Sequence, residues 1–301
     1  MGSPPVIDGH AHLQSELPVE GAVRAMDEAG VAQALVMACL RDPLPAGAPA
    51  VKRVLSALLS RGDTLHRLGR WAYAGLVDGA RRVVGETRLG IRQAPDNEAV
   101  ARAVARYPSR LRGLYFVNPL AEPDARRQVS ELERYVGERG FVGAKAHVWW
   151  YRYRLVRGLM PVARWCAARR RPLLVHLGGT PESSAVAGLW GKLPLLPIIV
   201  AHGGVPLFSR LWEQARSAPN VYVDLAGAYV TPALMREAAR VLGPERLVFG
   251  SDAPSGLRHG GGHAYRPLLA AVRALPLRAE AIEGILGGNL ARVLDGVRQA
   301  A

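Results

Sequence analysis

The stretch Val6-Ile-Asp-Gly-His10-Ala-His12 is a short apolar run that ends in two histidines one residue apart. In a β-strand the side chains at positions i and i+2 point to the same face, so a strand here places His10 beside His12. Two imidazoles on one face can share a single cation at about 2.0–2.1 Å each. This pattern favours a metal site over two unrelated histidines. Asp8 lies on the same face and is expected either to orient a ligand imidazole or to make a local cap.

Short apolar runs of this kind recur along the chain and alternate with amphipathic stretches. The expected strands are Val6–His12, Gln33–Ala38, Leu111–Asn118, Val142–His147, Pro172–His176, Ile198–His202, Val221–Asp224 and Leu247–Ser251. The expected helices include Val19–Ala29, Glu98–Tyr107, Ala125–Glu138, Leu155–Arg169, Leu207–Ser217, Pro232–Leu242 and Tyr265–Leu275. Such alternation indicates parallel strands with right-handed crossovers. Eight of them predict an α/β fold, a TIM (β/α)8 barrel, as a single domain over residues 1–301.

One segment, at about residues 41–110, does not fit the alternation of strands and helices. It follows the second strand and combines a Pro- and Ala-rich loop, a helical pattern near Val51–His66 and a turn-rich stretch near Asp78–Asp96. We expect an insertion here. Loops that follow barrel strands lie at the C-terminal face, so the insertion either covers the site as a lid or is a passive surface excursion.

Three more histidines, His147, His176 and His202, end predicted strands. The C-terminal ends of barrel strands converge on one mouth, which is the face that carries active sites. His176 ends an apolar strand and precedes two glycines, so we interpret it as a further metal ligand. His202 has a similar context and is either a second such ligand or, as we prefer, a general acid/base.

Asp252 directly follows the last predicted strand, in Leu247-Val-Phe-Gly-Ser-Asp252. Its carboxylate can ligate a metal and accept a proton from a metal-bound water, whose pKa the ion lowers. An N-cap for the following segment is the alternative. His10, His12, His176 and Asp252 together leave an open position for water if the site is five-coordinate.

The fourth strand contributes Lys145 and His147 to one face. A lysine that faces a barrel interior is costly unless it is paired or modified. Lys145 is therefore expected to contact a substrate anion, to be carboxylated between two metals, or to pair with Asp8 or Asp252. We expect His147 to contact the substrate or to support a ligand.

Two further positions are candidates for substrate binding. Trp149-Trp-Tyr-Arg152 follows the fourth strand directly and offers an apolar wall with a cation for an anionic group. The alternative is that these aromatic residues only pack the loop onto the barrel. Arg41, just after the second strand, is a comparable candidate at the rim.

Composition restricts the functional class. The chain has 301 residues, 49% of them hydrophobic, and no run approaches the roughly 18 apolar residues of a membrane span. The net charge of +14 is spread along the chain, so we expect a solvated arginine-rich surface and no nucleic-acid partner, with an acidic substrate or partner as the alternative. Two distant cysteines exclude a disulfide framework. Without a recognisable signal peptide, this composition favours the cytoplasm.

These motifs together resemble the amidohydrolase superfamily, and they occur in its order: His10-Ala-His12, Gly143-Ala-Lys145-Ala-His147, Val175-His176, Ala201-His202-Gly-Gly204 and Gly250-Ser-Asp252. The match is best to the amidohydrolase-related (amidohydrolase 2) branch, which includes aminocarboxymuconate-semialdehyde decarboxylase. Ile285–Arg292 also resembles the closing helix of this branch. The resemblance implies a distorted TIM barrel, frequently dimeric, that binds one divalent metal, usually zinc. It implies His10, His12, His176 and Asp252 as ligands and His202 as acid/base.

The leading functional hypothesis is a metal-dependent hydrolase that cleaves an amide, lactone or ester bond of a small molecule through a metal-activated water. Asp252 would carry the proton to the leaving group, and His202 would polarise or stabilise the oxygen. A nonoxidative decarboxylase in the same fold is the alternative, with Arg41 or Arg152 holding a carboxylate. A metal-dependent nuclease of this fold typically has a glutamate where this chain has Lys145. A non-catalytic binding protein with the same barrel is the last alternative, and the full set of candidate metal ligands argues against it.

Overall fold

The computed structural model describes residues 4–13, 18–39, 90–151, 155–177, 186–227, 230–254 and 265–298, together with scattered positions between 54 and 85. Most of the expected insertion at about 41–110 lies outside these residues, so its role as a lid stays a prediction. From residue 90 onward the segment is described, and it forms a turn followed by helix α4 (Asn97–Arg106).

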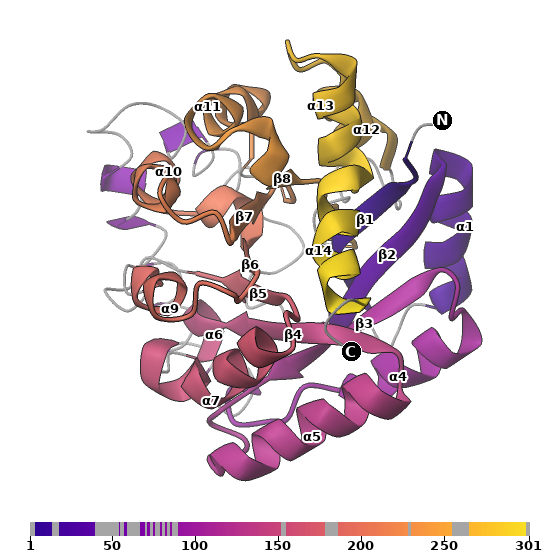
Figure 1. The fold of residues 1–301 in the computed structure, drawn as a ribbon, viewed down its shortest axis with the longest axis vertical. Coiled ribbons are helices and arrows are strands. Elements are labelled where there is room, and N and C mark those ends of the chain that lie inside the picture. The colour runs from indigo at the N-terminus through magenta and orange to yellow at the C-terminus, as the bar shows by residue number, and fades with distance from the viewer. Residues whose placement is uncertain are drawn as a thin grey trace.

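Eight parallel strands form one sheet in the order of the chain, with the helices packed outside them (Figure 1). The strands are β1 (Val6–Leu13), β2 (Val31–Ala38), β3 (Leu111–Val117), β4 (Phe141–His147), β5 (Leu173–His176), β6 (Ile198–Val200), β7 (Val221–Asp224) and β8 (Leu247–Val248). Each strand pairs in parallel with the next, as right-handed helical crossovers require. The architecture confirms the predicted α/β TIM barrel.

The remaining described helices connect these strands or close the chain. They are α1 (Val19–Ala29), α5 (Ala125–Glu138), α6 (Val148–Tyr151), α7 (Leu155–Ala168), α9 (Ala187–Lys192), α10 (Ser209–Ala215), α11 (Pro232–Leu242), α12 (Tyr265–Arg273), α13 (Ala279–Glu283) and α14 (Asn289–Arg298). Short 3-10 turns cover Ala201–Gly204 and Pro244–Arg246, and a π-helical turn covers Gly284–Gly288. No helix among the described residues is both long enough and apolar enough to cross a lipid bilayer.

Hydrogen bonds between β1 and the chain after β8 close the ring of strands. Asp252 N donates to His10 O at 2.7 Å, and His12 N donates to Ala253 O at 2.7 Å. These bonds continue the parallel ladder beyond the two residues of β8 itself. The seam therefore brings the first and last predicted metal-binding motifs to the same end of the barrel.

Gly9 permits this seam to form. Its backbone N–H donates to Phe249 O at 2.9 Å, and a Cβ at this position would lie 2.7 Å from Val248 Cγ1 and 3.0 Å from Phe249 O. Contacts this short do not occur without displacement of the neighbouring chain. The glycine in Asp8-Gly9-His10 is thus required by the close approach of two strands.

Apolar side chains that point inward fill the barrel. One buried cluster joins residues from six strands with two from α14, namely Ile7, Leu35, Met37, Leu114, Leu174, Ile199, Val248, Leu290 and Val293. Their burial supplies the main stabilising force for the barrel. Helix α14 contacts β1 and β8 and so covers one opening (Figure 1). The polar side chains that the sequence places at the strand ends gather at the other opening.

Two strands end two or more residues earlier than the sequence pattern predicts. β6 stops at Val200 instead of His202, and β8 stops at Val248 instead of Ser251. His202 and Asp252 both adopt left-handed backbone conformations, with φ of 54° at each residue. A left-handed residue cannot continue a strand, which excludes His202 from β6 and turns the chain at Asp252, beyond the predicted end of β8. Helices α1, α5 and α11 begin and end where the sequence predicts.

Replacement of Gly9 by alanine tests the seam. We expect Gly9→Ala to lower the free energy of unfolding by about 1–3 kcal/mol, because the new methyl group overpacks the contact between β1 and β8. Gly21→Ala is the matched control, since its Cβ would meet nothing within 4 Å on helix α1; the control should be neutral or stabilising by up to about 1 kcal/mol. Urea denaturation measures both, and equal stabilities for the two variants would contradict the tight seam.

Candidate metal centre

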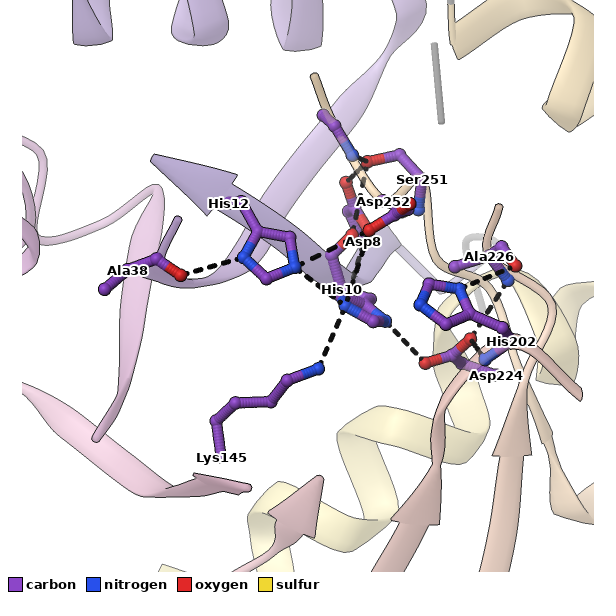
Figure 2. Close-up of polar contacts among 11 residues, drawn as sticks. Asp8, His10, His12, Ala38, Lys145, His202, Asp224, Ala226, Ser251 and Asp252 are labelled. Atoms are coloured by element: carbon purple, nitrogen blue, oxygen red, sulfur yellow. Dashed lines mark hydrogen bonds and ion pairs between the residues drawn. The ribbon is translucent and has the colours of Figure 1, made fainter. Parts of the chain in front are cut away.

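The rings of His10 and His12 are held in fixed orientations by acceptors behind them. His10 Nδ1 lies 2.8 Å from Asp224 Oδ2, and His12 Nδ1 lies 2.9 Å from the carbonyl oxygen of Ala38 (Figure 2). A carboxylate and a carbonyl only accept, so each Nδ1 carries the proton and donates it. Each Nε2 is therefore the nitrogen left to face the barrel mouth.

The two Nε2 atoms face each other at 3.1 Å. Burial lowers the pKa of His12 to about 3 and that of His10 well below its usual value, so both rings are neutral. Two neutral imidazoles that donate through Nδ1 present only lone pairs to each other at this distance. Such an arrangement is repulsive on its own, and it becomes favourable when a cation shares both lone pairs.

Asp252 adds an oxygen to this pair of nitrogens. Its Oδ1 lies 3.5 Å from His12 Nε2 and 3.7 Å from His10 Nε2. In a tetrahedral metal site with bonds of about 2.0–2.1 Å, donor atoms stand about 3.3 Å apart. The two nitrogens and one oxygen match this spacing, so the donor set of His10, His12 and Asp252 fits a divalent ion such as zinc.

Asp224, which the sequence analysis did not single out, orients His10. Besides its bond to His10 Nδ1, its Oδ1 accepts the backbone N–H groups of His202 at 2.7 Å and Ala226 at 3.0 Å. His10, His202 and Asp224 also form a second group of closely spaced ligand atoms. Both carboxylate oxygens of Asp224 already accept hydrogen bonds, however. Asp224 is therefore better placed to orient the candidate metal ligand His10 than to bind a metal itself. The missed signal was a buried strand, Val221–Asp224, that ends in a carboxylate at the same rim as the histidines.

His202 sits in a strained turn beside the two ligand candidates. Its backbone has φ 54° and ψ 44°, a conformation that costs about 1–3 kcal/mol for a residue other than glycine. Its Nδ1 lies 3.1 Å from Ala226 O, so Nδ1 donates and Nε2 keeps a lone pair. Gly227 leaves room for the ring, because a Cβ there would lie 2.7 Å from His202 Nδ1. Burial lowers the pKa of His202, so the ring is neutral and can accept a proton.

His147 and His176 extend the cluster of rings. The centroid of His176 lies 4.6 Å from that of His202 and 3.9 Å from that of His147, which it stacks against at 16°. The ring of His10 in turn lies 4.7 Å from that of His202. The structure therefore brings all five predicted histidines into one cluster. His176 is not a member of either group of closely spaced ligand atoms among the described residues, so its role as a ligand stays a prediction.

Lys145 reaches the same centre from β4. It is fully buried, and its Nζ lies 3.2 Å from His10 Nε2 (Figure 2). Burial lowers the pKa of this ammonium group to about 8, while the carboxylates of Asp224 and Asp252 favour its charged form. The side chain thus places a positive group, or a neutral amine, beside a candidate ligand atom, His10 Nε2.

Asp8 supports the backbone and does not orient an imidazole. Its carboxylate accepts the N–H of His10 at 3.0 Å, the N–H and hydroxyl of Ser251 at 2.9 and 2.5 Å, and the hydroxyl of Tyr265 at 2.9 Å. The expectation that Asp8 holds a ligand ring is therefore wrong, since Asp224 does so. Asp8 instead ties the ligand-bearing ends of β1 and the chain after β8 to helix α12.

Three substrate-binding candidates have side chains outside the described residues. Trp149 falls in the short helix α6, where the sequence suggested a loop. Arg152 and Arg41 lie in segments that the structure does not describe. Their contacts with a substrate stay predictions.

Comparison with known proteins decides the family. Residues 7–296 match the model of the amidohydrolase family. This chain belongs to the amidohydrolase family. The match covers nearly the whole sequence and confirms the predicted resemblance to the amidohydrolase-2 branch. A search of curated proteins found no match to this amidohydrolase.

Solved structures share the fold of this amidohydrolase at low sequence identity. It is similar to 4-oxalomesaconate hydratase from Rhodopseudomonas palustris, with 17% identity, a TM-score of 0.64 and coverage of 98% of this chain and 97% of the other. It is also similar to 5-carboxyvanillate decarboxylase from Sphingomonas paucimobilis, with 16% identity, a TM-score of 0.58 and coverage of 97% and 99%. A probable 2-pyrone-4,6-dicarboxylic acid hydrolase from Acinetobacter baumannii matches with 16% identity, a TM-score of 0.58 and coverage of 97% and 100%. These likenesses establish the barrel fold, and all three proteins are enzymes by name.

The pH dependence of stability tests the buried carboxyl of Asp8 in the metal-free amidohydrolase. Burial raises the pKa of Asp8 to about 6, above its unfolded value of 3.8. Its contribution to stability is thus fully present below about pH 4 and is lost as the pH rises through 6. We expect the stability of wild type relative to Asp8→Asn to fall by about 3 kcal/mol over this range.

Urea denaturation of both proteins at several pH values measures this difference in unfolding free energy. Titratable groups that the two proteins share contribute equally to both and drop out of the difference. A difference that stays constant, or that grows with pH, would show that the carboxyl of Asp8 is not penalised by burial.

Proposed function

We propose that this amidohydrolase is a metal-dependent hydrolase that cleaves an amide, lactone or ester bond of a small molecule. His10, His12, His176 and Asp252 would hold one divalent ion, zinc. The proposal is carried by the convergence of His10 Nε2, His12 Nε2 and Asp252 Oδ1, in which both imidazoles are neutral and fixed from behind. His176 supplies the fourth ligand from the ring cluster next to His202.

When bound, the ion lowers the pKa of a water and polarises the carbonyl under attack. Asp252 would accept a proton from the attacking water and deliver it to the leaving nitrogen or oxygen as the carbonyl–heteroatom bond breaks. Its side chain is 18% exposed, which gives it access to a substrate in the mouth. The products are a carboxylic acid and an amine or alcohol, or a hydroxy acid from a lactone.

His202 polarises the carbonyl oxygen or exchanges a proton with it through Nε2. Its Nδ1 is committed to Ala226 O, which fixes the tautomer that this role requires. The strained backbone at His202 and at Asp252 supports a functional role for both, because such strain concentrates at active sites.

Lys145 and His147 are the proposed contacts for an anionic group of the substrate. A buried ammonium group attracts a carboxylate strongly, because little water screens the interaction. Trp149, Arg152 and Arg41 are proposed to line the outer part of the same site.

A nonoxidative decarboxylase is the second candidate, and the buried charge of Lys145 is the observation that favours it. The reaction needs a substrate carboxylate held in the mouth, and Lys145 is the described cation placed to hold one. The carbon–carbon bond to the carboxylate breaks, carbon dioxide leaves, and a proton replaces it on carbon. Measured carbon dioxide release distinguishes this outcome from hydrolysis.

Metal content and activity of an Asp252→Asn variant test the hydrolase. Asparagine tolerates the left-handed backbone, so the variant should fold, but it cannot take up a proton. We expect about one zinc ion per wild-type chain purified without chelators, and a fall in hydrolysis of about 10²–10⁴-fold in the variant.

Elemental analysis and a panel of amides, lactones and esters provide the readouts, with product identification by mass spectrometry. Asp27→Asn, at an exposed carboxylate on α1 paired with Arg110, is the control and should keep full activity. Absence of a bound divalent ion, together with full activity after His10→Ala, would overturn the proposal.

A further inference from the structure

Lys145 is a buried lysine whose head group meets a candidate metal ligand. The residue is fully buried, and its Nζ lies 3.2 Å from His10 Nε2 (Figure 2). Lys145 pairs in register with Leu174 of β5, which belongs to the apolar cluster inside the barrel, so the lysine side chain points inward. Because burial separates the head group from solvent, its N–H groups need acceptors inside the barrel.

His10 Nε2 offers a single lone pair to this head group. His10 Nδ1 donates its proton to Asp224 Oδ2 at 2.8 Å, so Nε2 is the unprotonated nitrogen of the ring. One lone pair can accept a hydrogen bond or bind a metal ion, but it cannot do both. An ammonium group and a neutral amine both carry N–H, so Lys145 donates to Nε2 in either form. The hydrogen bond from Lys145 and a metal bond to His10 are therefore alternatives.

The charge of Lys145 adds to this competition. An ion bound to His10 Nε2 at about 2.0–2.1 Å would lie no more than about 5.3 Å from Nζ in its present place. An ammonium group and a divalent cation repel each other strongly at such a distance, because little water screens them in a buried site. The carboxylates of Asp224 and Asp252 attract both cations and offset part of this repulsion.

We propose that Lys145 competes with the metal ion for the lone pair of His10 Nε2 and thereby lowers the metal affinity of the centre. This inference rests on the proposed metal-dependent function and adds a residue that limits metal binding. Once an ion takes the lone pair, Lys145 Nζ loses that acceptor, and a carboxylate of the substrate supplies another. Competition thus fits the proposed contact between Lys145 and an anionic substrate.

Two other roles for Lys145 make different predictions. A carboxylated Lys145 would itself bind metal, so its removal would weaken metal binding. A lysine that contacts only the substrate would leave metal affinity unchanged when it is replaced. The geometry favours competition, because Nζ already donates to the atom that the ion needs.

Zinc affinity, measured on the full chain by competition with a chromophoric chelator at one fixed pH, separates these roles. We expect Lys145→Met to tighten zinc binding about 10–100-fold, the range over which groups next to metal ligands alter affinity. Methionine keeps an unbranched side chain suited to a buried position, but it has neither N–H nor charge. Lys192→Met, at the exposed end of α9, is the control and should leave zinc affinity unchanged.

Lys145→Gln carries the test if Lys145→Met fails to fold, which circular dichroism reports. Glutamine keeps an N–H donor without the charge, so it should tighten zinc binding by a smaller factor. Weaker zinc binding by a folded variant would show that Lys145 helps to hold the ion, and unchanged binding would show that it does not compete. Either result overturns the inference and leaves the proposed function standing. Absence of zinc binding by wild type would instead overturn the proposed function, and the inference with it.

Discussion

The imidazoles of His10 and His12 meet through two nitrogens that both carry lone pairs, and the rest of the site depends on this contact. Asp224 and the Ala38 carbonyl take the Nδ1 protons, and burial keeps the rings neutral. Neither ring can flip to point its N–H at the other ring without losing the hydrogen bond that its Nδ1 makes to Asp224 or to Ala38 O. A cation between them would remove the repulsion, so the folded chain holds both rings in an arrangement that suits a metal ion.

The barrel seam determines where this contact forms. Asp8 fastens the backbone of His10 and of Ser251 to Tyr265, and the bond from Asp252 N to His10 O brings the third ligand candidate alongside. The left-handed backbone at Asp252 then turns its carboxylate toward the histidines. The same hydrogen bonds therefore stabilise the barrel and position the candidate metal ligands. A substitution at the seam is expected to change both the stability and the geometry of the site.

Local pattern predicted the fold and most of the residues that gather at the candidate site, because hydrophobic periodicity and strand-end histidines are visible in short windows of sequence. His10 with His12, and Asp252 after the last strand, were predicted in this way. The left-handed turns at His202 and Asp252 were not, since they follow from contacts with distant residues and not from glycine at those positions. Asp224 ended a predicted strand, but its role in orienting His10 did not follow from that position, because His10 lies 214 residues away in the chain. Trp149, Arg152 and Arg41 still rest on sequence alone.

X-ray absorption at the zinc edge, on protein loaded with one equivalent of zinc, tests the central claim most directly. The account predicts a shell of nitrogen and oxygen atoms at about 2.0–2.1 Å, with the outer-shell scattering of at least two imidazoles. His12→Ala should remove part of that imidazole signal and leave the ion more weakly bound. A sulfur shell at about 2.3 Å, or a spectrum that His12→Ala does not change, would contradict a metal held between His10 and His12.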